Sequence, residues 1–348
     1  GRILRLLLWW KIMKTKNKKL TFGIIGYGRF GRMWAKYLTK HGKVFVYDSK
    51  IQVSKSRNII STSLKGVVSA DVVFLAVPIS EIESVCRTIN PLLLPRTLVV
   101  DVCSVKMFPI LAMKKNLPKN QPFLATHPLF GPDSERKNHG LKGFKIVVSG
   151  SRGQSILARH LVNIFKKMEL KVIFSSPEKH DLEMARSQAL VHFIGRALTA
   201  LKLRPQYIST PDYQSLLRIN QMVDNDTWEL FFDMQNKNSF AENMRRRFMR
   251  ELGTLHNRIL MRKLDLTELR ASTEELDRSI IELLAERLKI VGKIGKLKKQ
   301  GKLKVFNGAR EKRLKALHRK YSQENKLDRE LADKIFDIII KHSRKIQI

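Results

Sequence analysis

Short apolar segments alternate with amphipathic stretches along the first half of the chain. Each apolar segment is four to eight residues long, which is typical of a buried strand. They cover residues 21–26, 43–48, 71–78, 97–101, 123–126, 145–149 and 171–174. The first is followed by a helical stretch at residues 32–40. Strands that alternate with helices predict an α/β fold with a doubly wound parallel sheet over residues 21–175.

The second half of the chain has helical periodicity. Residues 176–261 are rich in helix-forming segments and are expected to form an all-α dimerisation domain. Residues 264–299 repeat apolar side chains at helical spacing, which predicts one helix about 54 Å long. A domain of 87 residues (262–348) has an expected radius of gyration near ~12 Å, so this helix is expected to pair with a second copy. Further helices are predicted from Gly308 and at residues 329–343, where Asp328 fits an N-cap.

The N-terminal segment, the apolar runs and the cysteines indicate where in the cell the protein is expected. The chain starts at Gly1, and its first twelve residues are apolar and basic. We interpret them as upstream sequence before Met13, within a basic tail of residues 1–20. No apolar run reaches the ~18 residues that a membrane span needs. Two cysteines, Cys86 and Cys103, cannot form a disulfide framework, so a reduced, cytoplasmic compartment is predicted.

The net charge is unusually high. Sixty-seven Lys and Arg against 31 Asp and Glu give +36, which suggests a nucleic-acid-binding protein. The excess is spread at a similar density over the whole chain, whereas a nucleic-acid footprint concentrates on one face or tail. No specific nucleic-acid partner is therefore expected. A polyanion-binding helical protein stays open as an alternative, with weak salt-dependent binding.

A glycine-rich turn follows the first predicted strand. Its residues are Gly26, Tyr27, Gly28, Arg29, Phe30 and Gly31. The order strand, GxGxxG, helix, strand and acid within about 30 residues predicts a Rossmann-type dinucleotide site. Asp48 ends the second strand, where a carboxylate would accept hydrogen bonds from ribose hydroxyls and repel a 2′-phosphate. NAD is thus favoured over NADP, although Lys50, Lys55 and Arg57 could tolerate a phosphate.

Candidate chemistry lies after later strands, because ligands bind at the carboxyl ends of parallel strands. His127 opens a turn-rich loop that is expected not to be helical, and it can act as a base during hydride transfer. By position alone, a surface histidine is equally compatible. His192 lies in an apolar helical segment, where a buried structural histidine is the alternative. No histidine pair has the HExxH spacing, so no metal site is predicted.

Four motifs in the same order together resemble the prephenate and arogenate dehydrogenases of tyrosine biosynthesis. They are residues 26–31, 101–106 (DVCSVK), 126–133 (THPLFGPD) and 178–195 (EKHDLEMARSQALVHFIG). Residues 209–230 also fit. The resemblance implies that His127 deprotonates the ring hydroxyl and that Ser104 orients it. It further implies that His192 and Arg218 bind substrate; Gln188, four residues before His192, is expected on the same helical face.

The C-terminal segment carries basic residues whose angular positions around a helix axis can be compared. Arg287 and Lys298 are 11 residues apart and lie within about 20° on a helix. Arg270 and Arg287 differ by about 100°, so they are not expected to reach the same pocket from one helix. Ser343 and Gln347 share a face. Fixed cations with a glutamine suit a dianionic substrate.

This segment resembles the all-helical chorismate mutase over residues 262–348. The resemblance implies that Arg287, with the partner's Arg270, binds the two carboxylates. Lys298 and Gln347 would address the ether oxygen, and Glu311 with Lys298 the ring hydroxyl. Arg310 and Ser343 would support the pocket. Asn307 stands where an aspartate is frequent in the family.

Together, the two resemblances predict a fused homodimeric enzyme that makes prephenate from chorismate and then oxidises it with NAD to 4-hydroxyphenylpyruvate. Its partners would be these small molecules, with no membrane. Fused arogenate dehydrogenase and a hydroxy-acid dehydrogenase with a helical domain stay open as alternatives. The hydroxy-acid reading leaves the C-terminal cations unexplained.

Overall fold

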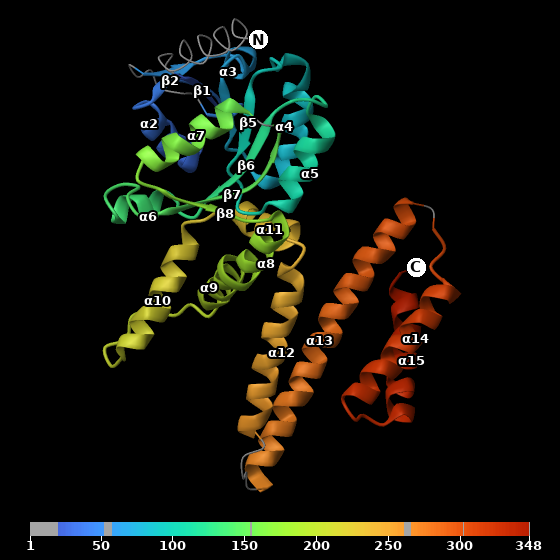
Figure 1. Cartoon of the computed structure of the whole chain (residues 1–348). Helices are drawn as coiled ribbons and strands as arrows, with labels where there is room; N and C mark the ends of the chain where they lie inside the picture. The colour runs from blue at the N-terminus through green and yellow to red at the C-terminus, as the bar shows by residue number, and fades with distance from the viewer. Residues whose placement is uncertain (1–19, 52–57, 154, 261–265, 302, 348) are drawn as a thin grey trace, which may run out of the picture. The chain divides into compact units, whose positions relative to one another are not determined.

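The computed structural model describes residues 20–51, 58–153, 155–260, 266–301 and 303–347 (Figure 1). The chain divides into two compact units, Gly1–Glu251 and Leu252–Ile348. The predictions on residues 1–12 and Met13, and on Lys55 and Arg57, lie outside the described residues. Within the described part, no helix is long and apolar enough to cross a membrane.

The first unit begins with an eight-stranded sheet in the order β3-β2-β1-β4-β5-β6-β7-β8. The strands are β1 (Leu20–Ile25), β2 (Gly42–Tyr47), β3 (Ile59–Ser61), β4 (Val72–Leu75), β5 (Leu98–Asp101), β6 (Phe123–Pro128), β7 (Lys145–Arg152) and β8 (Lys171–Phe174). All seven predicted segments form strands, which confirms the α/β prediction. Two details were wrong. The sheet contains β3, too short to show a pattern, and β6 and β7 pair antiparallel.

Helices cover both faces of this sheet. They are α2 (Arg29–Leu38), α3 (Leu64–Val68), α4 (Ile82–Ile89), α5 (Met107–Asn116), α6 (Pro132–Lys137) and α7 (Ile156–Lys167), with 3-10 turns at Ile79–Glu81 and Asn90–Leu92. One apolar core lies between the sheet and α2 with α7, and a second between the sheet and α3, α4 and α5. Trp34 of α2 is fully buried in the first core, among four phenylalanine rings. The doubly wound arrangement is thereby confirmed.

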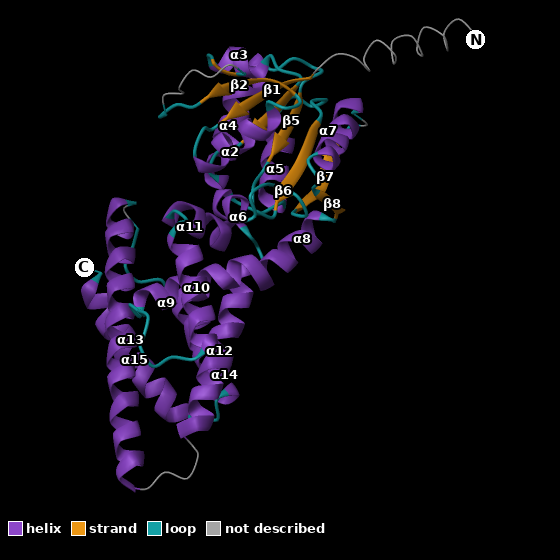
Figure 2. Ribbon diagram, turned by 90° about the vertical axis from the view of Figure 1, so that its left-hand side faces the viewer, coloured by secondary structure: helices purple, strands orange, loops and turns teal. Residues whose placement is uncertain are grey.

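The chain then becomes wholly helical (Figure 2). The elements are α8 (Pro177–Met184), a π-helical turn (Ala185–Ala189), α9 (Leu190–Ala200), α10 (Pro211–Asp224), α11 (Trp228–Lys237) and α12 (Ala241–Leu260). Asp233 of α11 accepts hydrogen bonds from the backbone and hydroxyl of Ser80, next to β4. Asn238 donates to the backbone oxygen of Asp181 on α8 over 2.8 Å. The partly buried contacts of Asp233 hold α11 near the end of β4, and the buried contact of Asn238 holds α8 near the end of α11.

The described part of the second unit contains the end of α12 and the long helices α13 (Leu266–Gln300), α14 (Gly308–Glu324) and α15 (Arg329–Ile346). The predicted long helix is confirmed, and Gly301 follows its end. Asp328 caps α15 by accepting a hydrogen bond from Leu331 N. Along α13, Leu276, Ile280 and Ile294 are exposed, so the helix keeps an apolar face that this unit does not cover.

Candidate functional site

The glycine loop lies between β1 and α2. Gly26 has φ +97°, and a Cβ there would lie 2.3 Å from the carbonyl oxygen of Ala76. A Cβ at Gly31 would lie 2.1 Å from the oxygen of Gly26. A Cβ at Gly28 would meet nothing within 4 Å. Two glycines therefore allow tight packing, whereas Gly28 presents its backbone to open space, as a pyrophosphate requires.

Gly28 is also the N-cap of α2, and no side chain caps the helix there. Its first turn consists of Arg29, Phe30 and Gly31, so the helix begins three residues earlier than predicted. The N–H groups of a first helical turn lack intrahelical acceptors and attract anions. This geometry fits a dinucleotide phosphate. Binding by these residues stays a prediction.

Asp48 follows β2 and reaches back to the glycine loop. Its Oδ2 accepts a hydrogen bond from Tyr27 N over 2.6 Å, and its Oδ1 accepts from Lys50 N and Ile51 N. Burial raises the pKa of Asp48, but these backbone donors outweigh burial and the pKa lies below its usual value. The carboxylate is therefore charged beside the loop, where a 2′-phosphate would be repelled.

Arg29 contacts residues that lie far from the glycine loop in the sequence. Its Nη2 lies 2.7 Å from both carboxylate oxygens of Asp133 on α6, and its Nη1 donates to Asn225 O. Arg29 thus ties the glycine loop to α6 and to the turn after α10. The predicted contact of Arg29 with the cofactor stays a prediction.

His127 lies within β6, not after it, and α6 begins at Pro132. The prediction of an irregular loop was therefore wrong at both ends: the pairing of β6 with β7 extends to Pro128, and Gly131 caps a helix that starts with proline. His127 is 4% exposed. Burial, followed by the charges of His180 and Lys106, lowers its pKa well below the usual value. The imidazole is thus neutral and able to accept a proton.

Ser104 does not hold His127. Its buried hydroxyl has no hydrogen-bond partner among the described residues. Nδ1 of His127 instead lies 2.9 Å from Nε2 of His180, on α8. In this structure the side-chain hydrogen bond to His127 is therefore made by His180, which stood in the quoted motif without an assigned role; the role implied for Ser104 stays a prediction.

Lys106 is fully buried and contacts the residue before His127. Its ammonium forms an ion pair with Asp101 at the end of β5 and donates to the carbonyl oxygen of Thr126 on β6. Burial raises the pKa of Asp101, and the Lys106 charge opposes that rise. The pair joins the ends of two neighbouring strands and so fixes the backbone that carries His127.

His192 is half-buried on α9 and faces Asp226, with Nδ1 to Oδ2 at 3.7 Å, too long for a hydrogen bond. Burial lowers the pKa of His192 and raises that of Asp226, and each group opposes the shift of the other. Arg196, one turn further on α9, lies over the Trp228 ring at 4.3 Å. Sequence reasoning missed Arg196, although its i,i+4 spacing from His192 could have indicated it.

The structure does not join the other two predicted substrate residues to this cluster. Gln188 lies in the π-helical turn, so the α-helical spacing that put it on one face with His192 does not hold. Arg218 is exposed on α10 and donates to Ser215 Oγ on its own helix. Both assignments stay predictions.

In the second unit, α13 and α15 bring four predicted mutase residues together. Arg287 Nη1 donates to Ser343 Oγ over 2.6 Å, and burial lowers the pKa of Arg287. Lys298 Nζ donates to Gln347 Oε1 at 3.0 Å and to Val305 O at 2.7 Å. The predicted common face of Arg287 and Lys298 is therefore directed at α15. A cation pair with a neutral amide fits an anionic ligand.

The remaining mutase residues are placed differently. Glu311 forms an ion pair with Arg344, which sequence reasoning did not select, and among the described contacts of Glu311 there is none with Lys298. Arg310 is exposed. Asn307 caps α14 by accepting a hydrogen bond from Arg310 N, a role that asparagine performs as well as aspartate. Arg270 is exposed near the start of α13, about 26 Å of helix from Arg287.

Comparison with known proteins finds two enzyme families in one chain. The family model of the prephenate dehydrogenase nucleotide-binding domain matches residues 34–144, and that of type II chorismate mutase matches residues 269–348. A TYRAAT1-like C-terminal domain matches residues 197–272.

Individual proteins agree with these matches. Arogenate dehydrogenase 2 of Arabidopsis thaliana is 32% identical over 241 residues, which cover 65% of this chain and 67% of that protein. The chorismate mutase of Methanocaldococcus jannaschii is 32% identical over 82 residues, 24% of this chain and 83% of that protein. The crystal structure of prephenate dehydrogenase from A. aeolicus, in complex with hydroxyphenyl propionate and NAD+, has a TM-score of 0.53 at 20% identity. The match covers 78% of this chain and 99% of the A. aeolicus chain, and shows that the two chains share a fold.

Proposed function

The chain belongs to the prephenate and arogenate dehydrogenase family and carries a type II chorismate mutase domain; from this we propose that it converts chorismate to prephenate and then oxidises prephenate with NAD. The products of the second step are 4-hydroxyphenylpyruvate and carbon dioxide. The observation that carries the proposal is the buried, neutral His127 at the end of β6, in the same sheet as the glycine loop.

In the dehydrogenase half, His127 Nε2 takes the proton of the ring hydroxyl while the ring carbon that bears this hydroxyl loses hydride. NAD bound along the glycine loop would accept that hydride on its nicotinamide ring. Loss of the ring carboxylate then leaves an aromatic ring, and the proton returns to its oxygen. The residues mainly position the substrate and supply a base, since aromatisation favours the reaction. The unpaired hydroxyl of Ser104 is a hydrogen-bond donor for the ligand.

In the mutase half, the cations hold chorismate in a compact conformation. Arg287 would bind a carboxylate, while Lys298 and Gln347 lie together where a breaking C–O bond gains negative charge. The rearrangement needs no nucleophile, only electrostatic stabilisation and a restricted conformation.

Absorbance at 340 nm tests both halves. Purified protein is mixed with NAD and either chorismate or prephenate, and then with NADP in place of NAD. NADH from both substrates supports the whole proposal. NADH from prephenate alone would contradict the mutase half. No signal with prephenate, while arogenate gives NADH, would make this an arogenate dehydrogenase, as the name of the Arabidopsis relative suggests.

Asp48 is expected to set the cofactor preference. In Asp48→Asn, the ratio of kcat/KM for NAD to that for NADP should fall by about tenfold to hundredfold, because a charge-assisted hydrogen bond contributes about 1.5–3 kcal/mol. Steady-state kinetics with both cofactors measure the ratio. Asp212→Asn, exposed on α10, is the matched control, and an unchanged ratio in Asp48→Asn would contradict the assignment.

We further propose that the mutase domain is a homodimer in which Arg270 completes the partner's site. Arg270→Ala and Arg287→Ala should each abolish most mutase activity. When the two variants are refolded together at 1:1, half of the dimers contain one copy of each variant. In such a mixed dimer, one of the two sites combines an intact Arg287 with an intact Arg270, so about a quarter of wild-type activity should return. Chorismate consumption measures it. Absence of any recovery would place both arginines in the same subunit's site.

Localisation rests on the cysteines. Cys86 and Cys103 are buried and free, so a reduced compartment such as the cytoplasm stays our prediction. A chloroplast location, which the name of the Arabidopsis relative carries, is the alternative.

A further inference from the structure

A chain of hydrogen bonds leads from His127 into the interior of the first unit. Nδ1 of His127 lies 2.9 Å from Nε2 of His180. Nδ1 of His180 lies 2.8 Å from Oδ1 of Asp181. The three side chains are 4%, 2% and 0% exposed, so water does not compete for these contacts.

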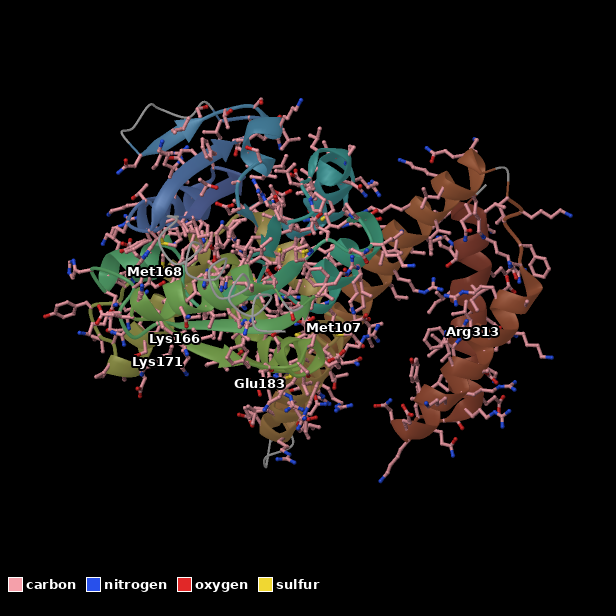
Figure 3. All side chains as sticks on the ribbon, turned by 45° about the horizontal axis from the view of Figure 1, so that its top comes forward. Met107, Lys166, Met168, Lys171, Glu183 and Arg313 are labelled. Atoms are coloured by element: carbon pink, nitrogen blue, oxygen red, sulfur yellow. The ribbon has the colours of Figure 1, made fainter. Side chains whose placement is uncertain are left out.

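Asp181 is held as an acceptor at the far end of this chain. Its Oδ1 accepts from Lys106 N at 2.7 Å and its Oδ2 from Met107 N at 2.9 Å, both at the start of α5. Met107 is one of the residues labelled in Figure 3. Since both oxygens already receive N–H groups, the group that faces Oδ1 from His180 must also be a donor.

With both imidazoles neutral, the positions of the protons along this chain of hydrogen bonds are determined. A neutral imidazole has one N–H and one lone pair. If Nδ1 of His180 carries the hydrogen that Asp181 accepts, its Nε2 carries the lone pair. Nδ1 of His127 must therefore be the protonated nitrogen and donate to His180. The lone pair of His127 is consequently on Nε2, for which no hydrogen bond is found among the described residues.

We propose that His180 and Asp181 are positioning residues that fix the tautomer of His127, so that its Nε2 is the base of the dehydrogenase reaction. This inference rests on the proposed function of His127. When Nε2 takes the substrate proton, His127 becomes a cation whose Nδ1–H remains bonded to His180. A neutral His180, which accepts this N–H through its Nε2 lone pair, and the Asp181 carboxylate behind it then stabilise that charge, in a place where burial and the Lys106 charge disfavour it.

The alternative is that His180 only fills space and caps Asp181. Two substitutions separate these roles. His180→Gln places an amide oxygen near the former Nε2 position and can still accept from His127 Nδ1. His180→Asn places its amide near the former Nδ1 position, so it can bond Asp181 but not reach His127. His139→Asn is the control, because His139 is exposed and its φ of +53° suits asparagine.

Kinetics with prephenate and NAD give the first test. We expect His180→Asn to lower kcat by about hundredfold, the lower range for general-base catalysis, with KM changed by less than about threefold. His180→Gln should stay within about tenfold of wild type. The deuterium isotope effect on hydride transfer should be larger in His180→Asn, since the chemical step then limits turnover. Equal kcat values for the two variants would overturn the proposal.

A second measurement avoids substitutions at His180. In ¹⁵N-histidine-labelled wild-type protein, the ring nitrogen shifts of His127, assigned by comparison with His127→Asn, report the tautomer directly. Protonated Nδ1 is expected, and protonated Nε2 would overturn the inference even if His180→Asn failed to fold. Failure of the proposed function is distinct: wild-type protein would then give no NADH from prephenate, whichever tautomer is found.

Discussion

Replacing His127 with asparagine is expected to lower the kcat of prephenate oxidation by about 10²–10⁴-fold and to leave chorismate rearrangement unchanged. The range is that of a lost general base. Asparagine can keep a hydrogen bond to His180 but cannot accept the substrate's proton. The mutase rate should not respond, because the predicted mutase residues belong to the other compact unit.

The comparison uses NADH formation at 340 nm and chorismate loss in the same preparation, with His139→Asn as the control. In wild type, the lowered pKa of His127 keeps the imidazole unprotonated, so any fall of kcat/KM on the acidic side should lie below about pH 6.5. A His127→Asn enzyme with kcat within threefold of wild type would assign the base to another residue.

Replacing Lys298 with alanine is expected to give the second large effect, a loss of about 10²–10³ in mutase kcat. Lys298 is half-buried, and its ammonium lies beside Gln347 Oε1 and Val305 O. Alanine removes the cation that would stabilise charge on the ether oxygen. Oxidation of added prephenate should be unaffected.

Lys296→Ala is the matched control, because Lys296 is exposed on the same helix two residues away. Circular dichroism of both variants checks that α13 is retained. A mutase rate in Lys298→Ala equal to that of Lys296→Ala would contradict a role for Lys298 at the ether oxygen and would favour Gln347 alone.

The local pattern of apolar residues and glycines was sufficient to predict the sheet architecture and the glycine loop. The apolar segments predicted seven strands because buried strands are nearly continuous apolar runs. The spacing of the glycines and Asp48, the helical period of α13 and the Asp328 cap can be seen directly in the sequence. β3 was not predicted because three residues are too few to show a hydrophobic period.

Only the tertiary structure decided which residues distant in sequence contact one another. His127 meets His180 across 53 positions, and Glu311 meets Arg344 across 33. No local pattern indicates which of several polar residues faces a given histidine or carboxylate; this follows from how α8 packs on the sheet and α15 on α14. Sequence alone therefore determined the fold class and the kinds of chemistry present, while burial and packing selected His180 rather than Ser104 as the partner of His127, and Arg344 rather than Lys298 as the partner of Glu311.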